Sequence, residues 1–332
     1  MHHKIKEALS KYKSIILVGG GTGGHIQPIL NILPELNEKN LLWIGGKDSN
    51  ESREATQVQV EFESIPTLKL ATTFSPKIFL YPIYLWKGFL EAKKILKKYR
   101  SDTCLFSKGG PGSVAVGIAA WSLKIPIYIH ESDTIPGRSN LILSKFATKI
   151  FLGFQSSIKY FPKEKSEFTG QILHSTFYTK KDIQGTIHWK TQKTHILVIC
   201  GSQGAKTVFE SIIKQFPGIT DFEWIISLGK LNAHMKSDFE KMNSTQSFDW
   251  IGQENIASLL RETDIAITRG SATTLAEIDA FSVKKIIIPL PSSARNHQLF
   301  NAKEYEKKGD IVLEQKDITL LKVIIEKLCQ RK

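Results

Sequence analysis

SIILVGGGTGGHIQP, residues 14–28, is the stretch of sequence that decides the fold. A short aliphatic run leads directly into closely spaced glycines, and a helix-compatible segment follows. This order predicts a strand, a tight loop and a helix. HILVICGSQGAKTVFESIIKQF, residues 195–216, repeats the arrangement. The chain therefore restarts near residue 195, which indicates two halves of similar architecture.

Further strand candidates alternate with helical stretches along the chain: LLWIG, CLFSKGG, IPIYIHE, KIFLGF, EWIISLG, DIAITRG and KIIIPLP. This alternation predicts an α/β protein with two doubly wound parallel sheets. A length of 332 residues is enough for two domains. We place their boundary in FTGQILHS, which gives an N-terminal domain of residues 1–169 and a C-terminal domain of residues 170–332. Open parallel sheets bind ligands beyond the carboxyl ends of their strands, so the loops there are the candidate site.

The composition narrows the class of protein. Lys and Arg number 45 against 32 Asp and Glu, a formal charge of +13, which predicts an anionic partner such as lipid, phosphate or nucleic acid. Nucleic acid is not expected, because no helix-turn-helix, zinc-finger or RNA-binding signature accompanies the charge. The three cysteines are far apart in sequence, which fits a reducing cytoplasm. An apolar run of only about five residues follows the basic N-terminus, too short for a signal peptide or a spanning helix.

The first glycine loop admits a second interpretation. Gly19, Gly21 and Gly24 match the spacing of a dinucleotide fingerprint, and Asp48 lies at a suitable distance to hold a ribose. An NAD-dependent oxidoreductase is therefore an alternative. His25 follows the glycines directly, where an NAD site normally has small apolar residues, and the loop at 201–204 is suited to a diphosphate at a helix start. Both features favour a sugar-nucleotide-dependent glycosyltransferase.

Several motifs carry a more specific resemblance: GGGTGGHIQP (19–28), GGPGS (109–113), AAWSLKIPIYIHESDTIPG (119–137), GSQGAK (201–206), TRGSATTLAEI (268–278), IIIPLP (286–291) and NHQLFNA (296–302). Together, in this order, they resemble the MurG family, the undecaprenyl-diphospho-muramoylpentapeptide β-N-acetylglucosaminyltransferases of peptidoglycan synthesis. The resemblance implies a GT-B fold of two Rossmann-like domains, with the acceptor on the N-terminal side and UDP-N-acetylglucosamine mainly on the C-terminal side. It implies an inverting hexosyltransferase that moves N-acetylglucosamine to the muramoyl 4-hydroxyl of lipid I, forming lipid II. The alternative is a GT-B transferase with another lipid-linked or glycolipid acceptor.

Inverting transfer needs a base for the acceptor proton and donors that stabilise the departing UDP. His25 is the candidate base, because an imidazole titrates near neutral pH, and Glu131 is the candidate to assist or replace it. The expected acceptor-binding residues are Gly109, Gly110, Ser132 and Asp133.

The donor residues follow from the same motifs. Ser202, Gln203 and Gly204 are expected to donate to the diphosphate, with charge added by Lys206. The resemblance implies that Glu277 accepts hydrogen bonds from the ribose hydroxyls and that Ile251 contacts uracil through its backbone. The remaining expected donor contacts are Thr22, Gly23, Gly24, His174, Ala272, Thr273, His297 and Gln298.

The chain departs from the family at one charged position. Where the family has an arginine near the end of a TGNPVR-like segment, this chain reads TGQILHS and places His174 there. We expect Lys206 or protonated His174 to compensate. The chain has no Asp-x-Asp pair and no His, Asp and Glu pattern with metal-ligand spacing, so we expect transfer without a metal or other cofactor.

Residues 74–98, FSPKIFLYPIYLWKGFLEAKKILKK, combine apolar and aromatic residues with a lysine cluster. Aromatic residues beside lysines favour an anionic membrane surface, and interrupting Pro and Lys residues exclude a bilayer span. A core helix with solvated lysines is the alternative. The family also has an apolar patch ringed by basic residues, which implies a peripheral protein on the cytoplasmic side of the bacterial membrane. The expected patch is Phe79, Leu80, Tyr84, Leu85, Trp86 and Phe89.

Overall fold

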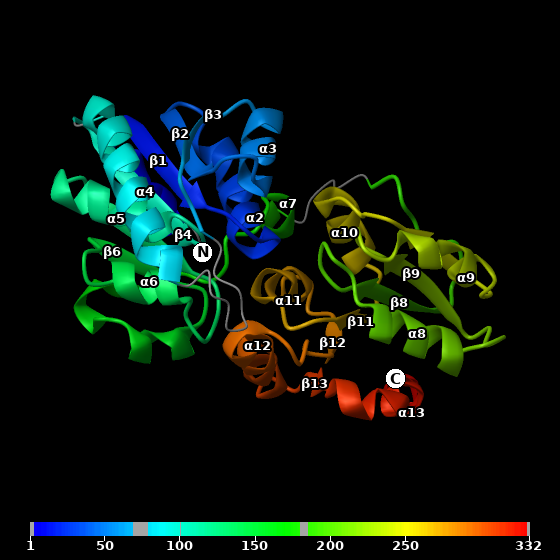
Figure 1. Cartoon of the computed structure of the whole chain (residues 1–332). Coiled ribbons are helices and arrows are strands. Elements are labelled where there is room, and N and C mark those ends of the chain that lie inside the picture. The colour runs from blue at the N-terminus through cyan, green and yellow to red at the C-terminus, as the bar shows by residue number, and fades with distance from the viewer. Residues whose placement is uncertain (1–2, 69–78, 100, 180–184, 331–332) are drawn as a thin grey trace. The chain divides into compact units, whose positions relative to one another are not determined.

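The computed structural model describes residues 3–68, 79–99, 101–179 and 185–330. The chain divides into two compact units, Met1–Ile172 and Leu173–Lys332. Each unit is a parallel β-sheet with helices on both faces (Figure 1). The predicted fold class, α/β with two doubly wound parallel sheets, is confirmed.

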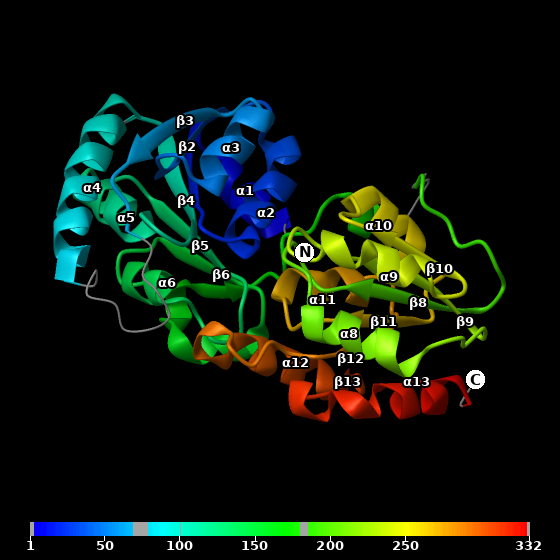
Figure 2. The same cartoon turned by 45° about the vertical axis from the view of Figure 1, so that its right-hand side comes forward.

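The N-terminal unit has a seven-stranded sheet in the order β3-β2-β1-β4-β5-β6-β7. Its strands are β1 (Ser14–Gly19), β2 (Asn40–Gly46), β3 (Glu61–Ile65), β4 (Thr103–Gly109), β5 (Ile127–Glu131), β6 (Lys149–Leu152) and β7 (Ser166–Phe168). Its helices are α1 (His3–Ser10), α2 (Gly23–Ile32), α3 (Asn50–Gln57), α4 (Tyr81–Leu96), α5 (Ser113–Ser122) and α6 (Arg138–Leu143). Helices α1, α2 and α3 lie on one face of the sheet, and α4, α5 and α6 lie on the other (Figure 2). Apolar residues of each set pack in a core cluster on their own face.

The C-terminal unit has a six-stranded sheet in the order β10-β9-β8-β11-β12-β13. Its strands are β8 (Thr194–Ile199), β9 (Phe222–Ser227), β10 (Thr245–Phe248), β11 (Ile265–Thr268), β12 (Lys284–Ile287) and β13 (Ile311–Val312). Its helices are α7 (Thr176–Thr179), α8 (Lys206–Gln215), α9 (Lys236–Glu240), α10 (Gln253–Leu260), α11 (Ala272–Asp279), α12 (His297–Glu306) and α13 (Leu321–Cys329). Short 3₁₀ helices lie at Leu33–Leu36, Lys97–Tyr99, Gln155–Tyr160, Lys163–Lys165, Ala233–Met235, Ala294–Asn296 and Gln315–Leu320 of the two units.

The central strands explain why the sequence folds this way. Ile15, Ile16, Leu17 and Val18 of β1 are all buried, because helices cover both faces of the sheet. A strand buried on both faces reads as a continuous apolar run, unlike the alternating pattern of a half-exposed strand.

The strand order also locates the candidate site. In each sheet the order reverses at its middle, between β1 and β4 in one unit and between β8 and β11 in the other. The loops that leave these neighbouring strands lead to helices on opposite faces, and open parallel sheets commonly bind ligands at such a point. Both glycine loops singled out from the sequence lie at such a switch point.

Candidate functional site

His25 lies in the first turn of α2, just after the glycine loop that leaves β1. Its Nδ1 is 2.9 Å from the Gly20 carbonyl oxygen and 3.4 Å from the Thr22 hydroxyl. A carbonyl oxygen can only accept, so Nδ1 carries the hydrogen and the lone pair lies on Nε2. In this tautomer, Nε2 is the atom that can take a proton.

Glu51 lies behind the same loop and was not identified from the sequence. Its carboxylate is buried and accepts from the Gly21 amide at 3.1 Å and from the Gly46 amide at 3.2 Å. A pyrophosphate in this loop would need the Gly21 amide and would meet a negative charge. Asp48, the ribose ligand of the oxidoreductase interpretation, is instead exposed at a left-handed position with φ of 53°. These features disfavour dinucleotide binding.

The loop after β4 lies against the loop after β1. Gly109 and Gly110 have φ of 84° and 92°. A Cβ on Gly110 would lie 2.5 Å from the Gly20 carbonyl oxygen. Glycine is required here by both the positive φ and the close approach. The expected acceptor residues Gly109 and Gly110 are therefore held beside the loop that leads to His25.

Lys108, a buried residue that the sequence did not single out, connects the loops after β4 and β5. Its ammonium group donates to the Ser132 hydroxyl at 2.7 Å, to the His130 carbonyl at 3.2 Å and to His130 Nδ1. His130 in turn donates through Nε2 to the Gly170 carbonyl at 2.9 Å. Burial lowers the pKa of Lys108, although the nearby Glu131 and Asp133 oppose this shift.

Glu131 holds the loop that contains the other expected acceptor residues. Its carboxylate is buried and accepts from the Asp133 amide at 2.9 Å, the Gly137 amide at 3.0 Å and Asn140 Nδ2 at 2.9 Å. Burial raises its pKa, and Asp133 adds to the shift. Donors from the loop and from α6 therefore hold this carboxylate in place. Ser132 lies half-buried on this loop.

In the C-terminal unit, the loop of residues 201–204 joins β8 to α8. The carbonyl oxygens of Gly201, Ser202 and Gln203 accept from the Gly204 amide at 3.1 Å, the Lys230 amide at 2.9 Å and Asn232 Nδ2 at 2.8 Å. Among the described residues, no acceptor bonds to the amides of Ser202 and Gln203. The loop therefore presents amide donors at a helix start, the arrangement that binds phosphates.

A second glycine turn supports this loop. A Cβ on Gly204 would lie 1.8 Å from the Leu228 carbonyl oxygen, and one on Gly229 would lie 2.4 Å from the Gly204 amide nitrogen. Buried Asn232 donates to both the Gln203 and the Leu228 carbonyls. Asn232 was missed from the sequence, where only its neighbour Gly229 gives a signal.

Glu277 lies on α11, which begins after the neighbouring strand β11. The residue is 6% exposed, and burial raises the pKa of its carboxyl group to about 7. No hydrogen-bond donor among the described residues contacts this carboxyl group. A largely buried carboxyl group without a protein donor is available to accept hydrogen bonds from a ligand.

Other residues expected to bind the sugar-nucleotide donor lie at the starts of α11 and α12. Buried Ala272 and Thr273 form the first turn of α11. His297 begins α12 with its Nδ1 2.8 Å from the Ala294 carbonyl, and Gln298 accepts from the Leu290 amide through Oε1 at 3.0 Å. Gln298 thus uses that oxygen to hold its own loop.

Three further residues expected near the sugar-nucleotide donor contact neighbouring protein groups. Ile251 is buried in a core cluster of the C-terminal unit. His174 Nδ1 is 3.0 Å from the Thr176 hydroxyl at the start of α7. Lys206 is exposed and its ammonium lies 3.6 Å from Glu210 one turn along α8, so it pairs along the helix. Of the first-loop residues expected to contact the donor, Thr22, Gly23 and Gly24 are exposed.

The residues of the expected membrane patch differ in exposure. Phe79 and Trp86 are 74% and 62% exposed, and Leu80 and Tyr84 are also exposed. Leu85 and Phe89 are half-buried and pack against the core. Trp86 stacks on Phe89 with ring centroids 5.6 Å apart. Residues 74–78 of the stretch lie outside the described residues.

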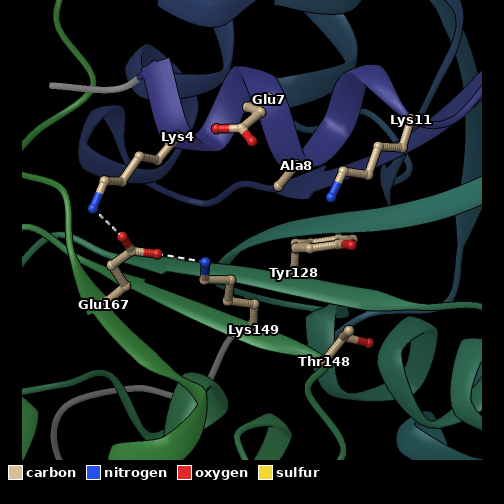
Figure 3. A pocket seen from close by; sticks show the side chains of 8 residues that line it. All are labelled: Lys4, Glu7, Ala8, Lys11, Tyr128, Thr148, Lys149 and Glu167. Carbon is tan, nitrogen blue, oxygen red and sulfur yellow. Dashed lines mark hydrogen bonds and ion pairs between the residues drawn. The ribbon is translucent and has the colours of Figure 1, made fainter.

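A cavity of about 240 Å³ lies between α1 and the first residues of β5, β6 and β7 (Figure 3). Glu167 accepts from Lys4 and Lys149 on one side of it. The cavity is at the amino edge of the sheet, opposite the loops described above, so it is not part of the candidate site. Within the described ranges, no three His, Cys, Asp or Glu side chains are grouped to hold a metal ion. None of the helices described there is long and apolar enough to cross a bilayer.

Both units match known domains. Residues 15–152 match the glycosyltransferase family 28 N-terminal domain, and residues 195–331 match the glycosyltransferase family 28 C-terminal domain. The chain thus has the N-terminal and C-terminal domains of a family 28 glycosyltransferase.

Individual relatives are more specific. A Clostridium perfringens protein named UDP-N-acetylglucosamine--N-acetylmuramyl-(pentapeptide) pyrophosphoryl-undecaprenol N-acetylglucosamine transferase is 34% identical over 317 residues, 93% of this chain and 87% of the relative. A Clostridium tetani protein of the same name is 31% identical over 323 residues, 95% and 89% of the two chains. The crystal structure of Acinetobacter baumannii MurG shares the fold, with a TM-score of 0.75, 22% identity and coverage of 96% and 92%. The chain belongs to the MurG family, as its motifs predicted.

Proposed function

We propose that the chain transfers N-acetylglucosamine from UDP-N-acetylglucosamine to the muramoyl 4-hydroxyl of lipid I, the undecaprenyl-linked muramoylpentapeptide, with inversion. The product is lipid II, and the process is peptidoglycan synthesis. The observation that carries the proposal is the division of chemistry between the two glycine loops. The first leads to the His25 imidazole, whose Nδ1 bonds to the Gly20 carbonyl, and the second presents amide donors. The strand next to β8, β11, leads to the buried carboxyl group of Glu277.

The C-terminal unit binds the donor. The Ser202 and Gln203 amides, Gly204 and the start of α8 stabilise the diphosphate, whose negative charge grows as UDP leaves. Glu277 accepts hydrogen bonds from the ribose hydroxyls, which supply the donors that its buried carboxyl group lacks in the described chain. The further contacts are Thr22, Gly23, Gly24, His174, Ile251, Ala272, Thr273, His297 and Gln298.

The N-terminal unit binds and activates the acceptor. The 4-hydroxyl oxygen attacks the anomeric carbon of the donor, the bond from that carbon to the phosphate oxygen breaks, and UDP leaves with the electron pair. His25 Nε2 takes the hydroxyl proton. Gly109, Gly110, Ser132 and Asp133 contact the acceptor, and Glu131 holds the last two in place.

The transferase assay combines radiolabelled UDP-N-acetylglucosamine with a lipid I analogue, beside a muramoyl-free lipid acceptor. We expect label only in the lipid I product, and in equal yield with excess chelator, because leaving-group stabilisation by amides needs no metal. Transfer to the muramoyl-free lipid alone would establish the alternative acceptor class. Lost transfer on chelation would contradict the metal-independent mechanism.

The α4 face supports peripheral binding to anionic lipid on the cytoplasmic side of the membrane. Exposed Tyr84 and Trp86 lie on α4, exposed Phe79 and Leu80 directly precede it, and its last turn carries Lys93 and Lys94. Apolar and basic groups in this combination bind the interface by apolar burial and charge.

Vesicle flotation tests this surface. We expect the wild type to float with vesicles containing anionic lipid, and Trp86→Glu to float less. Trp121→Glu is the matched control, because Trp121 is 54% exposed on α5, and it should float as the wild type does. Equal flotation of both variants with the wild type, or none by the wild type, would refute membrane binding through α4.

A further inference from the structure

One peptide group of the first glycine loop is hydrogen-bonded at both ends. Its carbonyl, that of Gly20, is 2.9 Å from Nδ1 of His25. Its N–H, that of Gly21, donates to Oε2 of Glu51 at 3.1 Å. The carboxylate, the peptide group and the imidazole therefore form one continuous chain of hydrogen bonds, which we call the peptide bridge.

We propose that Glu51 is a positioning residue that orients His25 and supports its basicity through the peptide bridge. This inference rests on the proposed function, in which His25 is the base. A carboxylate that accepts from the amide N–H polarises the peptide group, so the Gly20 carbonyl becomes a stronger acceptor for Nδ1–H. That bond holds the tautomer with its lone pair on Nε2. When Nε2 takes a proton, the carboxylate charge stabilises the imidazolium, the role that a directly bonded aspartate has in a serine protease.

The local geometry is built around this approach of the carboxylate. A Cβ on Gly20 would lie 2.3 Å from Glu51 Cδ, so no other residue could stand there without displacing the carboxylate. Gly21 has φ of 84°, a conformation that favours glycine. The Gly46 amide fixes the second carboxylate oxygen at 3.2 Å. Glu51 is 2% exposed, so solvent screens its charge weakly.

Lys108, a further charged side chain packed beside this loop, belongs to a different network. Lys108 of β4 passes the turn, where a Cβ on Gly19 would lie 2.9 Å from Lys108 Cβ. Its ammonium is directed to His130 and Ser132, and Glu131 and Asp133 are the acidic groups that act on it. Within these contacts, Glu51 is the carboxylate that bonds to the His25 loop.

The experiment measures the titration of His25 directly, by NMR of histidine-labelled protein, and so does not depend on transfer activity. Glu51→Gln keeps the side-chain size and removes the charge. Loss of a nearby negative charge destabilises the imidazolium, so we expect the His25 midpoint to fall by on the order of half a pH unit. The acidic limb of the kcat/KM profile should move to lower pH with it.

Glu223→Gln is the matched control. Glu223 is a buried carboxylate of the C-terminal unit that accepts from the Lys190 and Thr191 amides at 2.8 Å. We expect this variant to lose stability and to leave the His25 midpoint unchanged. If Glu51→Gln does not fold, Glu51→Asp, which withdraws the charge by one methylene, should give a smaller fall of the same sign.

The outcomes separate the two proposals. An unchanged His25 midpoint in a folded Glu51 variant overturns the peptide bridge. Glu51 would then only hold the glycine loop in place. A wild type that transfers nothing to the lipid I analogue overturns the proposed function and, with it, any catalytic part for Glu51. A lower His25 midpoint in Glu51→Gln, together with transfer to the lipid I analogue by the wild type, supports both proposals.

Discussion

The two glycine loops look alike in sequence and differ in what lies behind them. Behind the loop at 19–24 is the buried carboxylate of Glu51, which takes the Gly21 amide. Behind the loop at 201–204 are neutral groups, the Asn232 amide and the Leu228 carbonyl, which engage loop carbonyls or fill the space beside Gly204. A glycine motif thus reports close approach of another group, and the charge of that group decides whether the loop suits a base or a phosphate.

We expect the largest effect from a substitution that removes the imidazole after the first loop. His25→Ala should lower kcat by about 10² to 10⁴, the usual contribution of general acid–base catalysis, while UDP affinity stays near that of the wild type. Steady-state kinetics and calorimetric titration with UDP measure the two quantities. A folded variant with wild-type kcat would remove His25 from the mechanism.

We expect the next largest effect from a substitution that removes the neutral amide side chain beside the second loop. Asn232→Ala deletes the amide that holds the Gln203 and Leu228 carbonyls, so we expect UDP affinity to fall about tenfold, as for a lost buried hydrogen-bonding group. Asn31→Ala is the control, since Asn31 is a buried asparagine of the N-terminal unit that donates to the Ile172 carbonyl. It should lose stability and keep UDP affinity. Equal UDP affinities in both variants would contradict the division between the loops.

A smaller effect concerns pH. Burial raises the pKa of Glu277 to about 7, so this group contributes stability that is present below its unfolded pKa and lost as the pH rises through 7. Without ligand, Glu277→Gln should therefore melt higher than the wild type at pH 8 and lose most of that advantage at about pH 4, below the unfolded pKa of the carboxyl group. UDP affinity of the wild type should rise over the same interval, because the ionised carboxylate is the better acceptor for ribose hydroxyls. Parallel pH profiles for the two proteins would contradict this account.

The sequence predicted the elements whose signal is local. The apolar run of β1 and the glycines after it fix a strand and a loop, and His25 follows them directly. The family motifs place Glu277 in the same way.

The missed residues have partners far along the chain. Glu51 meets Gly21, Lys108 meets Ser132 and Asn232 meets Gln203 only once parallel strands bring their loops together. A single polar residue beside a strand or in a helix carries no periodic signal, so its partner cannot be read from the sequence.

The core-facing and exposed positions of α4 do have a local signal. Leu85, Phe89, Ala92 and Leu96 recur at helical spacing and form the stripe that faces the core. Exposed Trp86 lies off that stripe. The helical period therefore separates these two sets of positions, which apolar character alone does not.

The most direct test of the division between the loops is a structure of the protein with UDP bound. We predict the diphosphate within hydrogen-bond distance of the Ser202 and Gln203 amides and the ribose hydroxyls at Glu277, with the Gly21 amide still bonded to Glu51. A diphosphate seated on the Gly21 amide, with the loop at 201–204 empty, would contradict the account.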